Sequence, residues 1–400
     1  MIGAGRAGAA AAEEAALRLD GVTLVDGLES PSPDWGVWPE LIFRGPSCAG
    51  PVHRGREAVA GVTCEFGVRV AAVRRGSATT ADGRRLSADA FVLATGSGFE
   101  PVAVEGRTKL GVTTLDSPAK YRELGRSLDA LEVAVVSGEG SRGLQVAERL
   151  AEAGVRVALL ISSWQRGPPG PSTMEVLFEA AERAGVSVTA GVAERALGPG
   201  RTEAVLAAGR VIPSDALVVV PRRTPSPVPS PVAVGPRGGV SVGSDMRTNL
   251  PGIFAAGGCA EVCGGLPFDS VLDGAPVASG RVAGANAAGS HVSIRVPPPS
   301  TFAVFGLRWT RLGTTKPGPG LREVSGRQGE SSACSMVYDR VSGAVLGLEV
   351  VGDLGRSGWI VPPVGPRATL RALAYGAEGS SDISVISETA RLGLRAWSGS

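Results

Sequence analysis

Histidine is almost absent from this chain of 400 residues, which has only His53 and His291. Histidine-based metal centres and serine hydrolase triads are therefore not expected. Cysteine is also scarce: there are five, an odd number with no repeated C-x2-C spacing. This pattern favours reduced thiols in the cytoplasm over a framework of disulfides.

Long apolar runs and a strong charge of one sign are missing as well. No run reaches the roughly 18–20 apolar residues that a membrane span needs. No basic region precedes an apolar stretch at the N-terminus, so we predict no signal peptide. The formal net charge of +2 gives no electrostatic reason to expect nucleic acid or an anionic membrane as partner.

Glycine is abundant, with 58 residues, and two stretches of it form dinucleotide fingerprints. Residues 3–8 (GAGRAG) and 138–143 (GEGSRG) both have the form G-x-G-x-x-G and both precede a helix of small residues. The glycines permit a tight turn, close approach of the backbone to a diphosphate, and close packing of helix on sheet. The diphosphate then meets the N–H groups and the positive dipole end of the helix. One such match can arise by chance in a glycine-rich chain, but two indicate two dinucleotide sites and electron transfer between them.

Strands and helices alternate around both fingerprints. We predict a helix over residues 7–18 and a strand over 22–26, with Asp26 about 20 residues past the fingerprint, where an acid binds an adenosine ribose. A second β-α-β unit is predicted over residues 131–161. The fold class is therefore α/β, with two doubly wound, Rossmann-like domains built on parallel sheets.

The pattern changes from about residue 296. Strands are predicted over residues 301–307, 333–339 and 344–351, and helices over 367–375 and 386–396. This predicts a C-terminal α+β domain of roughly 100 residues.

Further segments carry a resemblance to a known family. Residues 91–97 (FVLATGS) resemble a strand with an A-T-G turn that closes an FAD domain, and residues 248–257 (TNLPGIFAAG) resemble the strand that leads to a flavin-facing loop. Residues 278–286 resemble the helix after that loop, and residues 336–352 resemble part of a dimerisation domain. With the two fingerprints, they make the chain similar to the pyridine nucleotide–disulfide oxidoreductases, nearest the single-cysteine branch of NADH oxidases and CoA-disulfide reductases.

The resemblance implies a domain order. It places the FAD-binding domain in two parts, residues 1–112 and 241–295, with the NAD(P)-binding domain over residues 113–240 between them. Residues 296–400 would form the dimerisation domain, which implies a homodimer.

The resemblance also implies roles for single residues, each at a turn or strand end. They are Gly3, Gly5, Gly8 and Asp26 for the ADP half of FAD; Val70 for adenine; Thr95 and Gly96 near the phosphates; Gly257, Gly258, Cys259 and Ala260 at the ribityl chain and flavin edge; and Gly138, Gly140 and Gly143 for NADPH or NADH.

Two departures from the family pattern concern FAD. The strand before Gly3 is reduced to Met1 and Ile2, which we interpret as a start placed downstream of the natural one, or else as a loss of flavin binding. Gly258 stands where the family has an aspartate that accepts hydrogen bonds from ribityl hydroxyls, a loss of about 1.5–3 kcal/mol. Glu261 is read as an acid at a helix N-terminus and not as its replacement.

The nucleotide choice of the second site is left open. Its second strand ends at Ile161 without the acid typical of NADH users, and Ser162, Ser163 and Arg166 follow. Arginine pairs with phosphate in a bidentate manner, which favours the 2′-phosphate of NADPH. NADH, or no nucleotide at all, are the alternatives.

Cys48 is the candidate catalytic thiol, since the single-cysteine branch has one cysteine in this loop and Arg44 and Arg54 are near in sequence. The alternative is an ordinary loop cysteine. Cys259 and Cys263 could pair or lie near the flavin, against the simpler reading of small residues in a crowded turn. Two tryptophans of the loop, Trp35 and Trp38, could wall a substrate pocket or simply pack.

Two functions remain. The first is an oxidoreductase that passes a hydride from NAD(P)H to FAD, and then electrons to a disulfide or sulfur species, a quinone, oxygen or a small electron-carrier protein. The second is a degenerate family member with a structural or partner-binding role.

Overall fold

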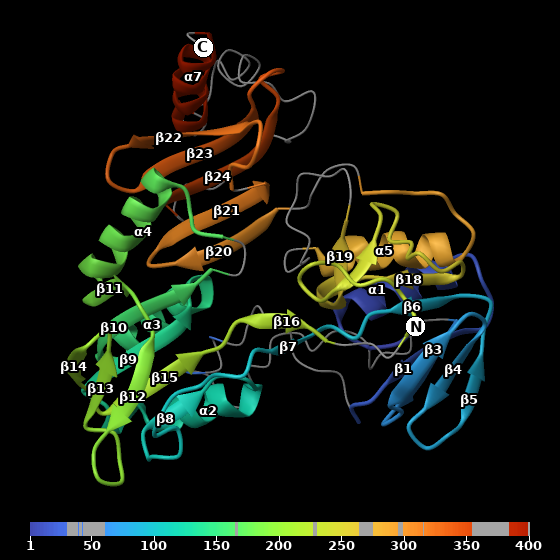
Figure 1. Cartoon of the computed structure of the whole chain (residues 1–400), viewed down its shortest axis with the longest axis horizontal. Helices are drawn as coiled ribbons and strands as arrows, with labels where there is room; N and C mark the ends of the chain where they lie inside the picture. Colours follow the sequence, from blue (N-terminus) through green and yellow to red (C-terminus); the bar gives the residue numbers. More distant parts are fainter. Residues whose placement is uncertain are drawn as a thin grey trace. The chain divides into compact units, whose positions relative to one another are not determined.

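The computed structural model describes residues 1–29, 39, 42, 61–164, 167–226, 230–263, 275–294, 299–314, 316–353 and 384–398. The chain divides into two compact units (Figure 1). The first unit takes residues 1–37, 49–98 and 223–298, and the second takes residues 38–48, 99–222 and 299–400.

A parallel sheet forms the centre of the first unit. In one pair, β1 (Val22–Asp26) lies beside β2 (Val62–Phe66), and in the other β6 (Phe91–Leu93) lies beside β18 (Ile253–Ala255). Ile2 forms parallel bridges to both Val25 and Leu93, and its side chain is buried. The short N-terminal segment therefore takes the place of a central strand and joins the two pairs.

Two helices cross at very short range beside this sheet. They are α1 (Arg6–Ala16) and α5 (Pro276–Ala287). A Cβ atom on Gly280 would lie 2.2 Å from the carbonyl oxygen of Ala7, and one on Gly284 would lie 2.2 Å from that of Ala11. Only glycine fits at these two crossing points.

Shorter elements complete the first unit. An antiparallel meander follows the order β3-β4-β5, and β17 lies parallel to β19. The remaining strands, β7 and β16, fall where the chain passes from one unit to the other. The bounds are β3 (Val70–Arg74), β4 (Ser77–Thr80), β5 (Arg85–Ser87), β7 (Ser97–Phe99), β16 (Arg223–Pro225), β17 (Val240–Val242), the 3-10 helix η5 (Gly257–Cys259) and β19 (Ala260–Val262).

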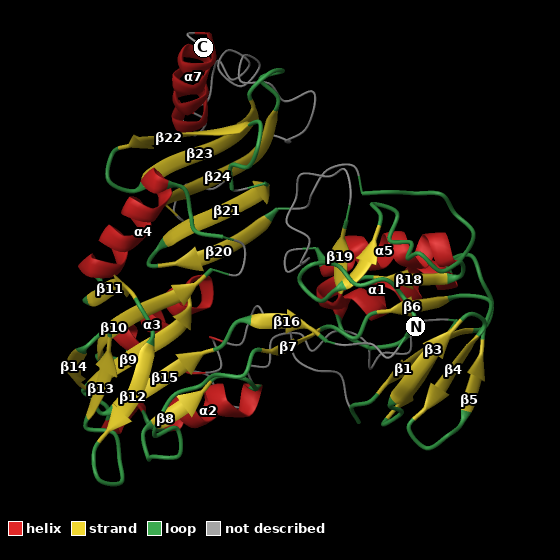
Figure 2. Ribbon diagram, viewed as in Figure 1, coloured by secondary structure: helices red, strands yellow, loops and turns green. Residues whose placement is uncertain are grey.

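A five-stranded parallel sheet in the order β11-β10-β9-β15-β8 forms one half of the second unit, with a small antiparallel sheet in the order β12-β13-β14 (Figure 2). The three central strands, β9, β10 and β15, are rich in buried aliphatic residues, as expected for strands covered on both faces, whereas β8 and β11 at the edges are more exposed. The bounds are β8 (Val112–Thr114), α2 (Pro118–Arg126), η4 (Leu128–Ala130), β9 (Val133–Glu139), α3 (Gly140–Glu152), β10 (Arg156–Ser163), α4 (Pro171–Arg183), β11 (Val186–Ala190), β12 (Ala193–Leu197), β13 (Ala204–Ala207), β14 (Arg210–Pro213) and β15 (Ala216–Val220).

An antiparallel sheet in the order β20-β21-β24-β23-β22 forms the other half, and α7 (Ser384–Ser398) packs on β22 and β23. Helix α4 contacts both β11 of the parallel sheet and β23 of this one, so it lies between the two sheets (Figure 1). The strand bounds are β20 (Ser300–Val304), β21 (Leu307–Gly313), β22 (Leu321–Gln328), β23 (Ser332–Asp339) and β24 (Val345–Asp353).

The structure confirms the predicted α/β class with parallel sheets and corrects one detail of the C-terminal region. The single strand predicted over residues 301–307 is wrong, because Phe305 and Gly306 have φ angles of 50° and 71° and form the turn between β20 and β21. The strand β22 was not predicted. The helix predicted over 386–396 is α7, whereas the one over 367–375 lies outside the described residues.

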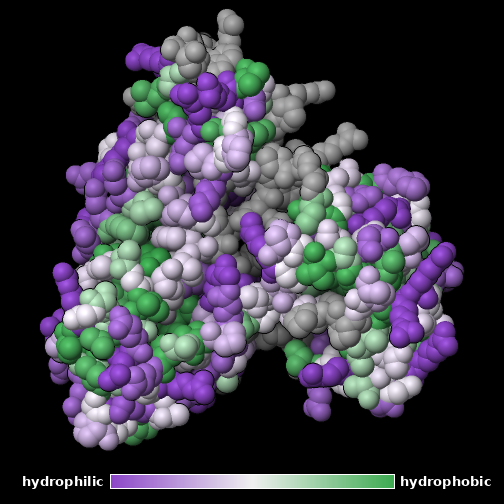
Figure 3. Space-filling model, viewed as in Figure 1, coloured by the Kyte–Doolittle hydropathy of each residue, from purple (hydrophilic) through white to green (hydrophobic). Residues whose placement is uncertain are grey.

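On the face drawn in Figure 3, hydrophilic and hydrophobic residues are interspersed in small patches. Within the described ranges, no helix has both the length and the apolar character required to cross a bilayer.

Candidate functional site

The first fingerprint forms a tight turn between Ile2 and α1. Gly3 has a φ of 101°, and a Cβ atom on Gly8 would lie 1.7 Å from the carbonyl oxygen of Gly3. The amide of Ala4 donates to Oδ2 of Asp26 at 2.5 Å, and the amide of Leu28 donates to its Oδ1 at 2.8 Å. The acid predicted to bind ribose therefore lies at the fingerprint, held by two backbone amides.

The N-terminus of α1 is open. Its N-cap residue is Gly5, and no side chain of the described residues caps the helix there. Among the described residues, no heavy atom lies within 4 Å of where a Cβ on Gly5 would stand. An anion can therefore reach the positive end of this helix without displacing any described group.

The residues of the 257–260 loop, which the sequence predicts to face the flavin, lie beside this turn. A Cβ on Gly257 would lie 2.7 Å from Cβ of Ala7, and one on Gly258 would lie 3.2 Å from Oγ of Ser97. A Cβ on Gly96, with φ 74°, would meet no heavy atom within 4 Å. The fold thus gathers three segments far apart in sequence, namely the fingerprint, the A-T-G turn and the 257–260 loop.

Cys259 belongs to the packed interior of this loop. Its side chain is fully buried, and its thiol donates to the carbonyl oxygens of Leu93 at 3.3 Å and Ala256 at 3.4 Å. Burial raises the pKa of the Cys259 thiol, which keeps it protonated and unreactive. Both Cys259 and Cys263 are free thiols.

The prediction for Glu261 is wrong in part. It lies in β19 and not at a helix N-terminus, and it is buried. Its carboxylate accepts hydrogen bonds from the amides of Arg237 at 3.0 Å and Gly239 at 3.3 Å. It therefore braces a turn and does not replace the aspartate missing at Gly258.

The second fingerprint lies between β9 and α3, but its helix end is not open. Glu139 accepts hydrogen bonds from the amides of Ser141 at 3.0 Å and Arg142 at 2.8 Å. A Cβ on Gly140 would lie 2.6 Å from the ring of Trp164. Neither contact was predicted from the sequence. An acid directly before a helix is an N-cap signal that could have pointed to Glu139, whereas nothing in the sequence pointed to Trp164.

The other two glycines of this fingerprint are in the expected places. Gly138 has a φ of 145°, and a Cβ on it would lie 1.9 Å from the carbonyl oxygen of Val220. A Cβ on Gly143 would lie 3.0 Å from Cδ1 of Leu159, a side-chain tip. The turn itself therefore has Rossmann-like geometry.

The loop after β10 is hydrogen-bonded to the C-terminal sheet. Glu349, which is buried, accepts from the amide of Gly170 at 2.6 Å and from Nε1 of Trp309 at 2.8 Å. Arg311, also buried, places Nε 3.0 Å from Oε1 of Glu349 and donates to the carbonyl oxygen of Gly167 at 3.1 Å. This cluster joins strands β21 and β24 to the loop before α4, and it was not predicted from the sequence.

The structure describes only some of the other predicted site residues. Val70 begins β3 and is half-buried. Cys48, Trp35, Trp38 and Arg166 lie outside the described residues. No group of three or more metal-ligating side chains forms among the residues that the structure describes.

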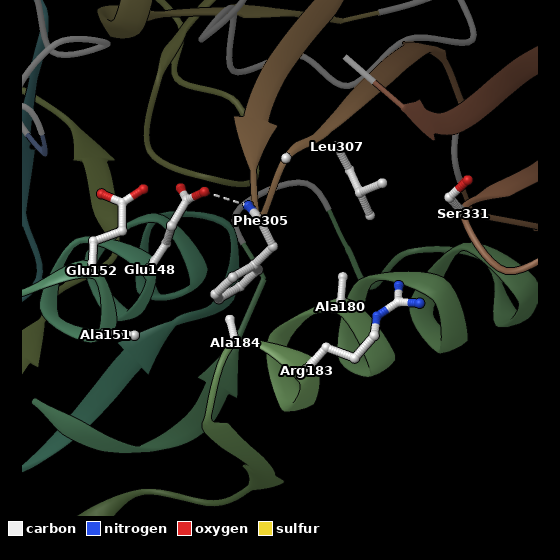
Figure 4. A pocket seen from close by; sticks show the side chains of 10 residues that line it. Glu148, Ala151, Glu152, Ala180, Arg183, Ala184, Phe305, Leu307 and Ser331 are labelled. Carbon is white, nitrogen blue, oxygen red and sulfur yellow. Dashed lines mark hydrogen bonds between the residues drawn. The ribbon is translucent and has the colours of Figure 1, made fainter. Parts of the chain in front are cut away.

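A pocket of about 540 Å³ lies between α3, α4 and the β20–β21 turn (Figure 4). Glu148 on α3 accepts from the amide of Phe305 at 2.5 Å, and the Phe305 ring points toward Ala184 at the end of α4. Arg183 lines the α4 side. None of the predicted cofactor residues lines this pocket.

Glu148 gives a prediction for pH. Burial raises the pKa of its carboxyl, against the lowering by Arg149 and the Phe305 amide. The folded protein then binds this proton more readily than the unfolded chain, so this group's contribution to stability falls as pH rises from the ordinary glutamate pKa through the raised one. We expect Glu148→Gln to weaken that dependence in urea unfolding measured over a pH series. An unchanged slope would contradict it.

Comparison with known proteins identifies the family. Residues 1–288 match the model of the pyridine nucleotide-disulphide oxidoreductases. The chain belongs to this family. It is 30% identical over 271 residues to the ferredoxin reductase component of chlorobenzene dioxygenase from Cupriavidus sp. strain PS12, a match that spans 63% of each chain. It is 27% identical over 217 residues to an NADH oxidase from Methanocaldococcus jannaschii, spanning 50% of this chain and 47% of that one.

Solved structures share the fold of this pyridine nucleotide-disulphide oxidoreductase. A water-forming NADH oxidase from Lactobacillus brevis matches with a TM-score of 0.81 and 17% identity, over 100% of this chain and 98% of that one. An NAD-dependent persulfide reductase from A. fulgidus matches with a TM-score of 0.77 and 19% identity, over 100% and 83%.

The two cofactors typical of the family fit this chain unequally. FAD fits the first fingerprint. The described residues leave open its cradle, by which we mean the space at the second glycine and the helix N-terminus, here at Gly5, and Asp26 lies beside the turn. A nicotinamide dinucleotide does not fit the second fingerprint as it stands, because Glu139 holds the helix amides and Trp164 fills the space at Gly140.

Proposed function

We propose that this chain is an FAD-dependent oxidoreductase of the NAD(P)H-using type, with FAD held by the first unit. The open helix end at Gly5 carries the proposal. Amides at the start of α1 would bind the diphosphate of FAD, and Asp26 would accept from the adenosine ribose. Gly3 and Gly8 keep the turn tight enough for this approach.

The other FAD residues would surround the rest of the cofactor. The backbone of Val70 would contact adenine, Thr95 and Gly96 would lie near the phosphates, and residues 257–260 would face the ribityl chain and the flavin edge. When bound, FAD supplies hydride acceptance and onward electron transfer, while the protein orients it and excludes water.

The nicotinamide site is assigned to Gly138, Gly140, Gly143 and Arg166, with NADPH favoured over NADH because Ser162, Ser163 and Arg166 suit a 2′-phosphate. The acceptor is proposed as a small molecule or a small protein, a disulfide or sulfur species if Cys48 is the active thiol. The C-terminal sheet is proposed as the surface of a homodimer. The similarity to a ferredoxin reductase and an NADH oxidase supports this range of acceptors.

A second candidate is a family member without turnover that has a structural or partner-binding role. Two observations favour it: Gly258 supplies no carboxylate for the ribityl chain, and Glu139 and Trp164 occupy the second cradle.

Colour separates the two candidates. For the enzyme we expect purified protein to show the visible absorbance of oxidised flavin and to bleach anaerobically with NADPH or NADH. A colourless protein that added FAD does not reconstitute would support the second candidate and contradict the first.

Gly5→Ala tests the FAD assignment directly. The backbone of Gly5 suits alanine, with φ −71°, and the new methyl group would meet no atom of the described residues within 4 Å. It would instead stand where the diphosphate approaches, so we expect FAD affinity to fall by about tenfold or more while the apoprotein melts at an unchanged temperature.

Gly318→Ala is the matched control, because its methyl group would also meet nothing. Fluorescence titration of both apoproteins with FAD gives the affinities. Equal affinities for Gly5→Ala and Gly318→Ala would rule out the cradle at Gly5 as the FAD site.

A further inference from the structure

The two fingerprints of this chain differ at the atoms that would touch a diphosphate. At the first, no side chain in the described part of the chain caps α1, and no atom of that part lies within 4 Å of a Cβ built on Gly5. At the second, a carboxylate caps α3 and an indole ring lies against Gly140. Because the two turns share one sequence pattern, the difference comes from Glu139 and Trp164 and not from the glycines.

Glu139 occupies the anion-binding position of α3. Its two carboxylate oxygens accept from successive amides, those of Ser141 and Arg142, and the residue is only 6% exposed. These are the amides that a diphosphate would use in a site of this kind. If the carboxylate remained there, the diphosphate would lack those donors and face a like charge.

The ring of Trp164 fills the space beside Gly140. A Cβ on Gly140 would lie 2.6 to 2.8 Å from three carbons of its ring, so the ring covers the face that the second glycine leaves bare for a diphosphate. The ring also packs edge-on to Trp309, with centroids 6.1 Å apart. Trp309 in turn donates to Glu349. The C-terminal sheet thus holds the Trp164 ring against Gly140.

We propose that Glu139, together with Trp164, is an internal competitor for the dinucleotide diphosphate, which binds only after the carboxylate leaves the α3 amides and the ring leaves Gly140. This inference rests on the proposed function, since it concerns the nicotinamide site. The competition acts on the diphosphate, which NADH and NADPH share. It therefore lowers the affinity for both and sets no preference between them.

The test measures equilibrium binding of NAD⁺ and of NADP⁺ to the FAD-loaded protein by calorimetry. We expect Glu139→Ala to tighten binding of both by about tenfold or more, since it removes a charge-assisted competitor. The same variant should melt at a lower temperature without dinucleotide, because α3 loses its cap. A carboxylate with a merely structural role would give the lower melting temperature without the tighter binding.

Glu152→Gln is the matched control. It removes the same charge from the other end of α3, where the side chain of Glu152 is 47% exposed. We expect its affinities to stay within about twofold of the wild type, because exposed charges contribute little. Trp164→Ala is the second variant, which keeps the helix cap, clears the space at Gly140 and should also tighten binding.

The outcomes are distinct. The inference would be overturned if the wild type, Glu139→Ala and Trp164→Ala bound NAD⁺ and NADP⁺ with equal affinity. Bleaching of the flavin by NADPH would still support the proposed function in that case. No binding to any variant would overturn the inference as well, since opening the cradle would have gained nothing. If the wild type and all variants were colourless and did not bind added FAD, the proposed function would be contradicted as well.

Discussion

Replacing Glu349 with alanine is expected to lower the free energy of unfolding of the second unit by about 3–5 kcal/mol. The substitution leaves the buried guanidinium of Arg311 without its carboxylate, and removes the acceptor of the Gly170 amide and of the Trp309 indole. Breaking a buried ion pair from one side is costly because the remaining charge stays out of water. Urea unfolding, followed by circular dichroism, measures the loss.

Glu330→Ala is the control for this experiment. Glu330 pairs with Arg183 at 3.3 Å, but its side chain is 86% exposed. We expect a change of less than about 1 kcal/mol, as for most surface pairs. Similar losses for the two variants would mean that the buried cluster contributes no more than a surface pair.

The second large effect is expected at the third glycine of the first fingerprint. In Gly8→Ala, the methyl group would lie 1.7 Å from the carbonyl oxygen of Gly3, a backbone atom that cannot move aside without opening the turn. We expect a loss of about 3 kcal/mol or more in the stability of the first unit. The turn that we propose as the binding site of the FAD diphosphate would open too, so we expect FAD not to be retained.

Gly143→Ala, at the same place in the second fingerprint, is the comparison. Its methyl group would lie 3.0 Å from Cδ1 of Leu159, which can rotate away, so we expect a cost below about 1.5 kcal/mol. Thermal melts and flavin content of the two proteins give the result. If Gly8→Ala behaves like Gly143→Ala, the short approach between Gly8 and Gly3 is not essential to the fold.

Much of the fold was predictable because its signals are local. The helix after Gly5 and the strand ending at Asp26 follow from glycine spacing and from runs of apolar residues, and β1 is found at the predicted residues. The turn at Phe305 and Gly306 also had a local signal, the glycine, but the apolar residues on both sides of it were read as one strand.

The state of the second site could not be predicted in the same way. The glycines predict a turn, but they do not say which side chains fill the space that the turn leaves. The contact of Trp164 with Gly140, and that of Glu349 with Gly170, join residues far apart in sequence. Such pairs depend on how the loop after β10 packs against α3 and against the C-terminal sheet, which no pattern within one segment specifies.

The edge-on packing of Trp164 against Trp309 has a thermodynamic consequence. A ligand that must push the indole from Gly140 also has to break this ring contact, so its binding energy is spent partly on the C-terminal strands. Linkage is reciprocal. A change that strengthens the contact between those strands and Trp164 therefore weakens binding of the dinucleotide by the same free energy. If the proposed nicotinamide site is used, the buried packing of β21 and β24 would therefore influence how readily the dinucleotide binds.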